Sequence, residues 1–303
     1  MQSREIVVSV SCLTYNHAPY IRQCLDGFMM QKTDFAFEVL IHDDASTDGT
    51  AEIIKEYEAR YPDVIKPIYE EENQWVKGRR GSAVFNFPRA RGKYIALCEG
   101  DDYWTDPLKL QKQVDFLEQN PLYVMCSHRY DYYYQLNDTY DDNHNDTSRS
   151  YSLDFLLEGG WLFHPLTVMF KRSAIKNSAY YDCKVSMDAV LFYFILKQGP
   201  GYYLKDNMAV YRVHNGGVWS GINSHSRMLV EYKARLAIYE VDKSDDAAKF
   251  IKSQFLKDIG REFFLREWAI VSKALLIVCR HFGLLVTLKI ILKRIFMGKF
   301  PRI

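Results

Sequence analysis

The sequence predicts an α/β fold, with a mostly parallel sheet flanked by helices and followed by a helical C-terminal extension. Over the first 125 residues, apolar runs rich in β-branched residues alternate with segments whose apolar residues recur at helical spacing. Strands that alternate with helices form parallel sheets that are covered on both faces. The chain has 303 residues, of which 48% are hydrophobic, so it can build one large domain with an appendage.

The first part of the chain gives clear start and stop signals for its elements. Ser46, Thr47 or Asp48 can cap the second helix, which Pro62 stops, and Pro107 lies in the first turn of the third helix. The expected strands are 5–13, 37–41, 64–69 and 94–98, and the expected helices are 19–28, 50–60 and a segment from 105 or 106 to 120.

The second part is harder to assign, because its polar segments have less periodicity. Residues 128–150 are rich in Asp, Asn and Tyr, which indicates a loop or an irregular hairpin. Further strands are expected at 124–127, 166–170 and 208–213, and helices over 189–197 and 224–268. We therefore expect a catalytic-type α/β domain over 1–220, a helical extension over 221–267 and a basic amphipathic helical tail over 268–303.

Charge and cysteine usage limit the function classes. The formal net charge is +1, which gives no indication of nucleic-acid binding. None of the six cysteines forms a CxxC pair, and several lie in apolar runs, as buried free thiols do. The chain starts with a polar strand pattern rather than a secretory signal. We expect a cytoplasmic protein without disulfides or a zinc framework.

The tail has an unusual charge distribution. From Trp268 to Ile303 there are seven Lys or Arg residues and no Asp or Glu. Its apolar runs are shorter than the roughly 20 residues that a spanning helix needs. Such a segment suits the interface of an anionic membrane, and we expect peripheral membrane contact. The alternative is a pair of helices that packs on the body of the protein or on another subunit.

Acidic residues follow the strands at three places: Asp43 and Asp44, then Glu99 to Asp102, and later Asp188. Ligands of open α/β sheets bind beyond the carboxyl ends of the strands. Carboxylates that converge there repel one another unless a cation is bound. Mg²⁺ and Mn²⁺ prefer oxygen ligands and bridge phosphates, so either ion is the expected cofactor.

Four motifs together resemble the family 2 glycosyltransferases, which have the GT-A fold. The resemblance covers about residues 5–220, and the Asp-Asp segment corresponds to the family's DDxSxDGT pattern. The four motifs are Val10-Ser-Cys-Leu-Thr-Tyr-Asn16, Ile41-His-Asp-Asp-Ala-Ser-Thr-Asp-Gly-Thr50, Ala90-Arg-Gly-Lys-Tyr-Ile-Ala-Leu-Cys-Glu-Gly-Asp-Asp102 and Tyr211-Arg-Val-His-Asn-Gly-Gly217.

The resemblance implies a role for each matching residue in donor binding. Asp43 or Asp44 would accept hydrogen bonds from the nucleobase, and Asp101, or Asp102 in its place, would bind the metal. Glu99 stands where the family's DXD motif has its first Asp, so the sequence departs from the motif at this position. The resemblance implies that Glu99 contacts ribose or metal-bound water. The remaining candidates are Thr14 and Asn16 in the nucleotide pocket, Arg212, Arg79 and Arg80 toward phosphate, and His214 on metal or phosphate.

Asp188 matches the family's general base, ahead of an apolar helix. An inverting transfer needs a carboxylate that takes the proton of the acceptor hydroxyl. Asp188 can equally be the N-cap of its helix, and Asp182 or Glu158 can compete for the role of base. Trp104, with two other tryptophans, can stack on a sugar or lie in the core.

The expected reaction is the transfer of a sugar from a nucleoside-diphosphate sugar, most simply a UDP-sugar, to a hydroxyl of a glycan or lipid-linked acceptor. The resemblance and the tail suggest bacterial surface polysaccharide synthesis at the inner face of the cell membrane. Two alternatives stay open: a non-catalytic nucleotide-sugar or carbohydrate-binding protein of the same fold, and a sugar nucleotidyltransferase.

Overall fold

A computed structural model describes residues 5–78, 81–142, 146–217, 221–258, 267–284 and 287. The strands are β1 (Ile6–Thr14), β2 (Ala36–Asp43), β3 (Ile65–Tyr69), β4 (Tyr94–Leu97), β5 (Tyr103–Trp104), β6 (Met125–Tyr134), β7 (Thr139–Asp142), β8 (Arg149–Tyr151), β9 (Met169–Lys171) and β10 (Gly201–Val213). The α-helices are α1 (Ile21–Met29), α2 (Thr50–Arg60), α3 (Ser82–Phe85), α4 (Lys109–Gln119), α5 (Leu153–Leu157), α6 (Asp188–Leu196), α7 (Ser224–Asp242), α8 (Asp245–Asp258) and α10 (Trp268–Phe282). Short 3₁₀ turns cover Phe87–Arg89, Pro165–Thr167, Arg172–Ala174 and Ala179–Asp182.

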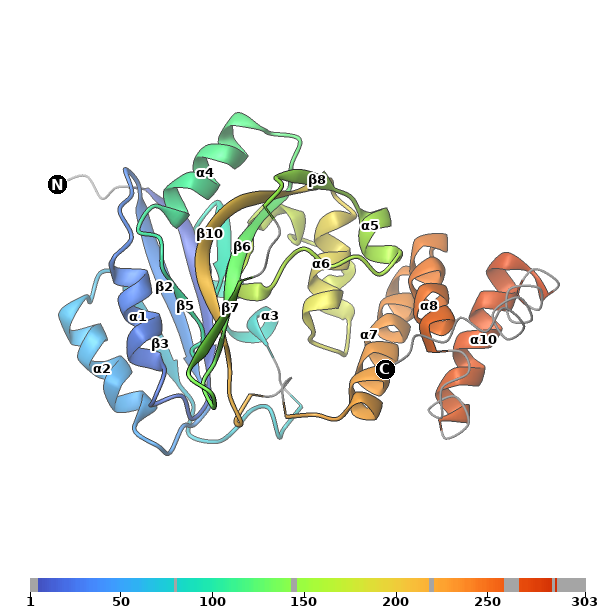
Figure 1. Ribbon diagram of the computed structural model, residues 1–303, viewed down its shortest axis with the longest axis horizontal. Coiled ribbons are helices and arrows are strands. Elements are labelled where there is room, and N and C mark those ends of the chain that lie inside the picture. Colours follow the sequence, from blue (N-terminus) through green and yellow to red (C-terminus); the bar gives the residue numbers. More distant parts are fainter. Residues whose placement is uncertain are drawn as a thin grey trace. The chain divides into compact units, whose positions relative to one another are not determined.

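One mixed sheet organises the first part of the chain (Figure 1). Its strand order is β3-β2-β1-β4-β9-β6-β10-β5, with β7 paired to β6 and β8 paired to β10. The pairs β2–β3, β1–β2, β1–β4 and β6–β10 are parallel, whereas β9 runs antiparallel to both β4 and β6. The predicted fold class, a mostly parallel sheet flanked by helices, is confirmed.

Helices α1 and α2 cover one face of the sheet, and α3 lies on the other (Figure 1). The spacing of Ile21, Cys24, Leu25 and Phe28 places the apolar side of α1 on the sheet, where these residues are fully buried. They pack in one core cluster with alternate residues of β1, such as Val10, and with one side of α4. The other face of β1 is covered as well, since Ser9 and Ser11 are also buried.

The observed elements agree with most of the predicted ones, and the differences have physical causes. Helix α2 has the predicted bounds, but its cap residue is Gly49, whose φ of 99° suits glycine, while Asp48 accepts a hydrogen bond from the Thr50 N–H (3.1 Å). The Asp- and Tyr-rich segment contains a hairpin, β6 with β7. Strand β7 is exposed along its whole length, so its polar residues gave no alternation to detect.

The chain divides into two compact units that interleave in sequence. The first comprises residues 1–152, 162–178 and 194–220, and holds the sheet; the second comprises 153–161, 179–193 and 221–303. The three-part division expected from the sequence stays a prediction.

In the second unit, α8 packs against both α7 and α10. Val271, Ala274 and Val278 form the buried side of α10, while Leu276 and Arg280 are exposed. Among the helices within the described ranges, none is long and apolar enough to cross a membrane. Most of the predicted tail beyond α10 lies outside the described residues.

Lys109, the first residue of α4, is fully buried. Its Nζ donates a hydrogen bond to Gln113 Oε1 (2.7 Å) and lies 3.9 Å from the centre of the Trp104 ring. Burial lowers the pKa of Lys109 to about 7, opposed by the nearby thiols of Cys98 and Cys126. An unfolded lysine has a pKa of about 10.4, so folding releases a proton from Lys109 above pH 7.

We predict that stability relative to the Lys109→Met variant rises with pH. Between about pH 7 and pH 9 the unfolded wild-type chain binds one more proton than the folded chain, so wild type should gain roughly 1 kcal/mol per pH unit over the variant. Urea unfolding of both proteins at pH 7, 8 and 9 measures this gap. Loss of the hydrogen bond to Gln113 lowers the free energy of unfolding of the variant by the same amount at every pH. If the free energies of unfolding of the two proteins change in parallel with pH, Lys109 is not a neutral buried lysine.

Candidate active site

The carboxyl ends of three neighbouring strands form the candidate site. Strand β1 lies between β2 and β4, and Thr14 at its end is in register with Asp43 at the end of β2. Main-chain hydrogen bonds connect the segments that follow β2 and β4 to the end of β1: Asp44 N–H donates to Thr14 O (3.0 Å), and Gly100 N–H donates to Leu13 O (3.0 Å). The structure therefore brings the first two acidic clusters of the sequence to one sheet edge, with the end of β1 between them.

Asp101 lies between two imidazoles. Its Oδ2 is 3.1 Å from His214 Nε2 and 3.8 Å from His17 Nε2. Burial disfavours the charged form, but the hydrogen bond with His214 and the proximity of His17 hold the pKa of Asp101 below its ordinary value. Asp101 Oδ1 is buried and has no hydrogen-bond partner among the described residues. This oxygen is therefore available to a group that the protein itself does not supply.

Asp102 has a different environment from its neighbour. It is buried, and its Oδ1 accepts a hydrogen bond from the Arg212 N–H (2.8 Å). Burial raises the pKa of Asp102 well above its usual range, and the charge of Asp101 adds to the effect. The pKa values of these two adjacent carboxyl groups are therefore shifted in opposite directions, down for Asp101 and up for Asp102. This difference favours Asp101 as the ligand of a cation.

Arg212, on β10, joins three segments that are distant in sequence. Its Nε donates to Asp101 O (2.9 Å) and its Nη2 to Gln23 Oε1 on α1. The guanidinium also lies 5.1 Å from the centre of the Tyr20 ring, with two further tyrosine rings at similar distances. The side chain is buried and engaged within the protein. Direct contact of Arg212 with phosphate stays a prediction, whereas its contacts with the acidic loop are part of the fold.

Asp43 and Asp44 each hold a turn of the chain. Asp43 accepts hydrogen bonds from the hydroxyl and the N–H of Ser46, and burial raises the pKa of Asp43. Asp44 accepts from the N–H groups of Gln74 (2.6 Å) and Trp75 (3.2 Å) in the loop after β3. A carboxylate can accept about four hydrogen bonds, so both retain capacity for a nucleobase N–H.

The other predicted donor-site residues have distinct environments. Asn16 has a φ of 55°, and its Oδ1 accepts from the Thr47 N–H (2.9 Å), so it fixes the turn after β1. Thr14 Oγ1 is buried without a hydrogen-bond partner among the described residues. The side chain of Glu99 is exposed, and its main-chain oxygen accepts a hydrogen bond from the Cys24 thiol (3.4 Å).

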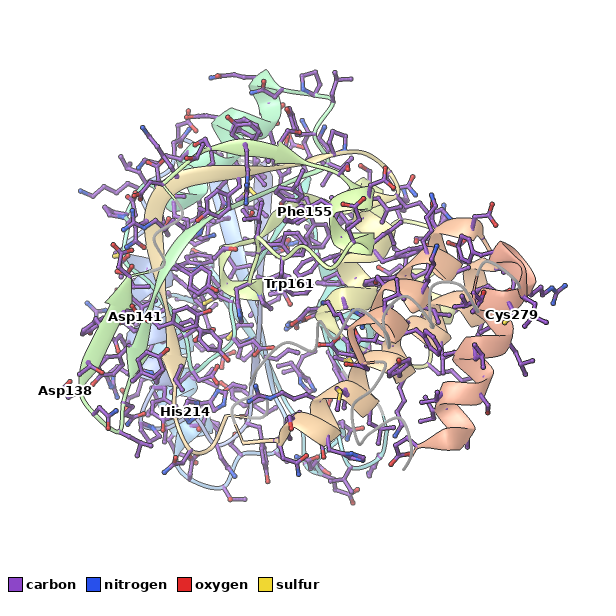
Figure 2. All side chains as sticks on the ribbon, turned by 45° about the vertical axis from the view of Figure 1, so that its right-hand side comes forward. Asp138, Asp141, Phe155, Trp161, His214 and Cys279 are labelled. Carbon is purple, nitrogen blue, oxygen red and sulfur yellow. The ribbon has the colours of Figure 1, made fainter. Side chains whose placement is uncertain are left out.

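Asp101 and His214, which lies just after β10 (Figure 2), fit the expected metal. Asp101 Oδ2 is already hydrogen-bonded to His214 Nε2 (3.1 Å), whereas Asp101 Oδ1 is buried without a partner among the described residues, so this oxygen would hold a hard cation beside the imidazole. No three His, Cys, Asp or Glu side chains of the described ranges form a metal-binding group. Substrate phosphates and waters would supply the remaining ligands, as is usual for Mg²⁺.

Asp188 opens helix α6 and belongs to the second unit. Its side chain is accessible to solvent, but the surrounding protein limits its solvation and raises the pKa of the carboxyl to about 6. A carboxylate with this pKa is ionised at neutral pH and is a stronger base than an ordinary Asp, as a general base requires.

His17, Tyr20 and Gln23 also belong to this region, although the sequence patterns did not single them out. Their signal was position alone, since they follow the end of β1 and enter α1. Trp104 is buried, and its Nε1 donates to Leu166 O (2.9 Å), so it belongs to the core rather than to a sugar-binding surface. Arg79 and Arg80 lie outside the described residues.

The chain is similar to several known proteins. The chain is 37% identical over 234 residues to the uncharacterized protein Rv1520 of Mycobacterium tuberculosis; the match covers 74% of this chain and 64% of the relative, so the chain spans less than two thirds of that protein. It is 29% identical over 217 residues to the putative teichuronic acid biosynthesis glycosyltransferase TuaG of Bacillus subtilis, covering 71% of this chain and 82% of the relative.

Two solved structures share the fold. TarS 1–349 of S. aureus in complex with UDP-GlcNAc has a TM-score of 0.65 at 17% identity, with coverage of 98% of this chain and 93% of that chain. The mannosyltransferase PcManGT of Pyrobaculum calidifontis, in complex with GDP-Man and Mn²⁺, has a TM-score of 0.51 at 18% identity, with coverage of 97% and 81%. The predicted GT-A-like fold is confirmed. The sequence profile of Glycosyl transferase family 2 matches residues 9–179, more than half of the chain, and this protein belongs to that family.

Proposed function

We propose that this protein is an inverting, metal-dependent glycosyltransferase that moves a sugar from a nucleoside-diphosphate sugar to an acceptor hydroxyl. The observation that carries the proposal is the ionised carboxylate of Asp101 with one buried oxygen, Oδ1, that has no partner among the described residues, next to the imidazole of His214. This pair suits a hard cation that bridges phosphates. Membership of the family supports a nucleotide sugar as the donor.

The donor would lie along the strand ends. Asp43 or Asp44 accepts a base N–H, Thr14 and Asn16 line the nucleotide pocket, and Glu99 contacts ribose or metal-bound water. Uracil is the expected base, with guanine as the alternative, because both present a ring N–H to a carboxylate. The relatives support both kinds of donor, since the TarS structure contains UDP-GlcNAc and the mannosyltransferase structure contains GDP-Man.

Asp101 and His214 would hold Mn²⁺ or Mg²⁺, which would neutralise the charge that grows on the leaving diphosphate. Arg212 keeps the acidic loop in place through the Asp101 carbonyl and the Asp102 carboxyl. Asp188 would accept the proton of the acceptor hydroxyl as that oxygen attacks the anomeric carbon from the face opposite the diphosphate. The bond from the anomeric carbon to the diphosphate breaks, and the sugar is transferred with inversion.

The acceptor is proposed to be a glycan or a lipid-linked glycan of a bacterial cell surface, at the cytoplasmic face of the membrane. The similarity to TuaG, whose name assigns it to teichuronic acid biosynthesis, supports this setting. Lys273 pairs with Glu240, but Leu276 and Arg280 are exposed on α10, in a segment of the sequence that has no acidic residue from 268 onward. An exposed apolar and basic helix side suits an anionic membrane surface.

A non-catalytic nucleotide-sugar-binding protein of the same fold is the alternative that differs most. It would need Asp101 and His214, but it would have no use for a carboxylate whose pKa is raised to about 6 at Asp188. A sugar nucleotidyltransferase is less favoured, because the sequence lacks a Gly-rich basic loop after the first strand.

The first prediction from this proposal is a metal-dependent stabilisation by one nucleotide. At about 100 times its Kd, a ligand of the folded state adds roughly 2.7 kcal/mol of stability. Thermal unfolding with UDP, GDP, dTDP and CDP, each with and without Mn²⁺, should show a clear rise in Tm for UDP only when Mn²⁺ is present. If no nucleotide raises the Tm at any metal concentration, the strand ends are not a donor site.

The second prediction concerns Asp188. Asp188→Asn should lower the transfer rate by about 10²-fold or more while donor binding changes little, because the amide cannot take the proton. Asp182→Asn, at an acidic residue of the same unit, is the matched control and should keep near wild-type activity. Wild-type turnover in Asp188→Asn would exclude Asp188 as the base.

The pH dependence of the rate follows from the same carboxyl. Because the base works only when ionised and the pKa of Asp188 is about 6, kcat should fall below about pH 6, approaching tenfold per pH unit. A kcat that stays level down to pH 4.5 in wild type would contradict the assignment.

Membrane contact predicts vesicle binding that depends on lipid charge. The full chain should float with vesicles that contain 30% anionic lipid and remain at the bottom of the gradient with zwitterionic vesicles, because the attraction to basic residues requires a negative surface. High salt should release the protein from the anionic vesicles. A protein that never floats with either vesicle does not use this segment as a membrane contact.

A further inference from the structure

The end of β1 carries a histidine that none of the assigned roles uses. His17 follows the turn at Asn16, and its main-chain N–H donates to Thr50 Oγ1 (2.8 Å). Thr50 is held in turn by Asp48, which accepts both its N–H (3.1 Å) and its hydroxyl (2.6 Å). The backbone of His17 is therefore fixed by α2, and its imidazole has a defined position rather than that of a free loop side chain.

The His17 imidazole is mostly buried, yet its polar atoms are poorly matched within the protein. Its Nε2 lies 3.8 Å from Asp101 Oδ2, too far for a direct hydrogen bond. Its Nδ1 is buried with no hydrogen-bond partner in the described part of the chain. A histidine that serves only the core normally has its ring nitrogens satisfied, so this environment indicates a group from outside the chain.

A second buried polar atom without a described partner, Thr14 Oγ1, lies close by. Both Thr14 Oγ1 and His17 Nδ1 pack against Gly100, where a Cβ atom would come within 2.7 Å of the first and 3.0 Å of the second. Thr14 and His17 therefore form one cluster with the loop that carries Asp101. Both side chains can donate a hydrogen bond to an anionic oxygen.

The order of the strands shows which part of the donor would meet this cluster. Strand β1 lies between β2, which ends at Asp43, and β4, which leads to Asp101. A ligand with its base at Asp43 and its metal-bound phosphates at Asp101 must cross the end of β1. The part that joins base to metal-bound phosphate is the ribose and the diphosphate, and the phosphate oxygens are its strong hydrogen-bond acceptors.

We propose that His17 is a diphosphate-binding residue, which together with the Thr14 hydroxyl donates to the phosphate oxygens of the nucleoside-diphosphate donor. This inference rests on the proposed function. A phosphate contact is favoured over a role for His17 as a further metal ligand for two reasons. His17 Nε2 lies further from Asp101 Oδ2 (3.8 Å) than His214 Nε2 does (3.1 Å), and among the described residues no three His, Cys, Asp or Glu side chains are grouped so that they could hold a metal ion.

The test is calorimetric binding of uridine, UMP and UDP, with Mn²⁺, to wild type, His17→Ala and His17→Asn. His17→Ala should weaken UDP binding about tenfold or more and leave uridine binding within a factor of two, since only the phosphate contact is lost. His17→Asn, whose side-chain amide can donate near the position of Nδ1, should recover part of the affinity. His225→Ala, at a histidine of the second unit, is the matched control and should bind UDP as wild type does.

Each contrary result has its own meaning. Equal UDP affinity in His17→Ala and wild type overturns the inference and leaves the proposed function intact. If His17→Ala loses the same affinity for uridine as for UDP, the pocket itself has changed. If His17→Ala loses Mn²⁺ binding in the absence of nucleotide, measured by electron paramagnetic resonance, His17 is a metal ligand. Either result overturns the phosphate contact. If wild type binds none of the nucleotides, with GDP, dTDP and CDP included, the proposed function fails as well.

Discussion

The hydrogen bond from the Arg212 N–H to Asp102 is the contact on which the candidate site depends. It joins β10, near the end of the sheet strands, to the acidic loop that follows β4, across 110 positions of sequence. The same residue uses its side chain to hold the Asp101 carbonyl and α1. Because the loop is held from both its main chain and its side chain, Asp101 can keep its carboxylate turned toward the histidines without rearranging when a ligand arrives.

Much of this arrangement could be predicted from residue patterns. The pattern predicts helix α2 over about Thr50 to Arg60, as observed, because an acidic turn precedes it and Pro62 follows it. The convergence of Asp43 and Asp101 followed from a rule of topology, since parallel strands bring their carboxyl ends to one edge. Local sequence patterns could not predict which residues distant in sequence contact one another. Nothing near Gln23 in the sequence indicates that its amide meets Arg212.

The hairpin and the long strands show a second limit. Strand β6 continues far beyond its apolar start, through a run of tyrosines that are only partly buried. Its partner β7 is polar and exposed. Strand β7 is held by main-chain hydrogen bonds to β6 and has no buried face, so its sequence shows no hydrophobic alternation. The opposite shifts in the pKa of Asp101 and Asp102 also depend on burial and on contacts, which adjacent letters of a sequence do not reveal.

The close packing of Gly100 against Thr14 and His17 has a consequence for how this site can vary. A methyl group at position 100 would come within 2.7 Å of the Thr14 hydroxyl oxygen and 3.0 Å of His17 Nδ1, so a change there requires Thr14 above all to shift or become smaller. A smaller residue at position 14 would in turn remove the hydroxyl that lies beside the His17 ring. The effects of substitutions at these positions are therefore epistatic, and single exchanges borrowed from another family member should fail where the paired exchange succeeds.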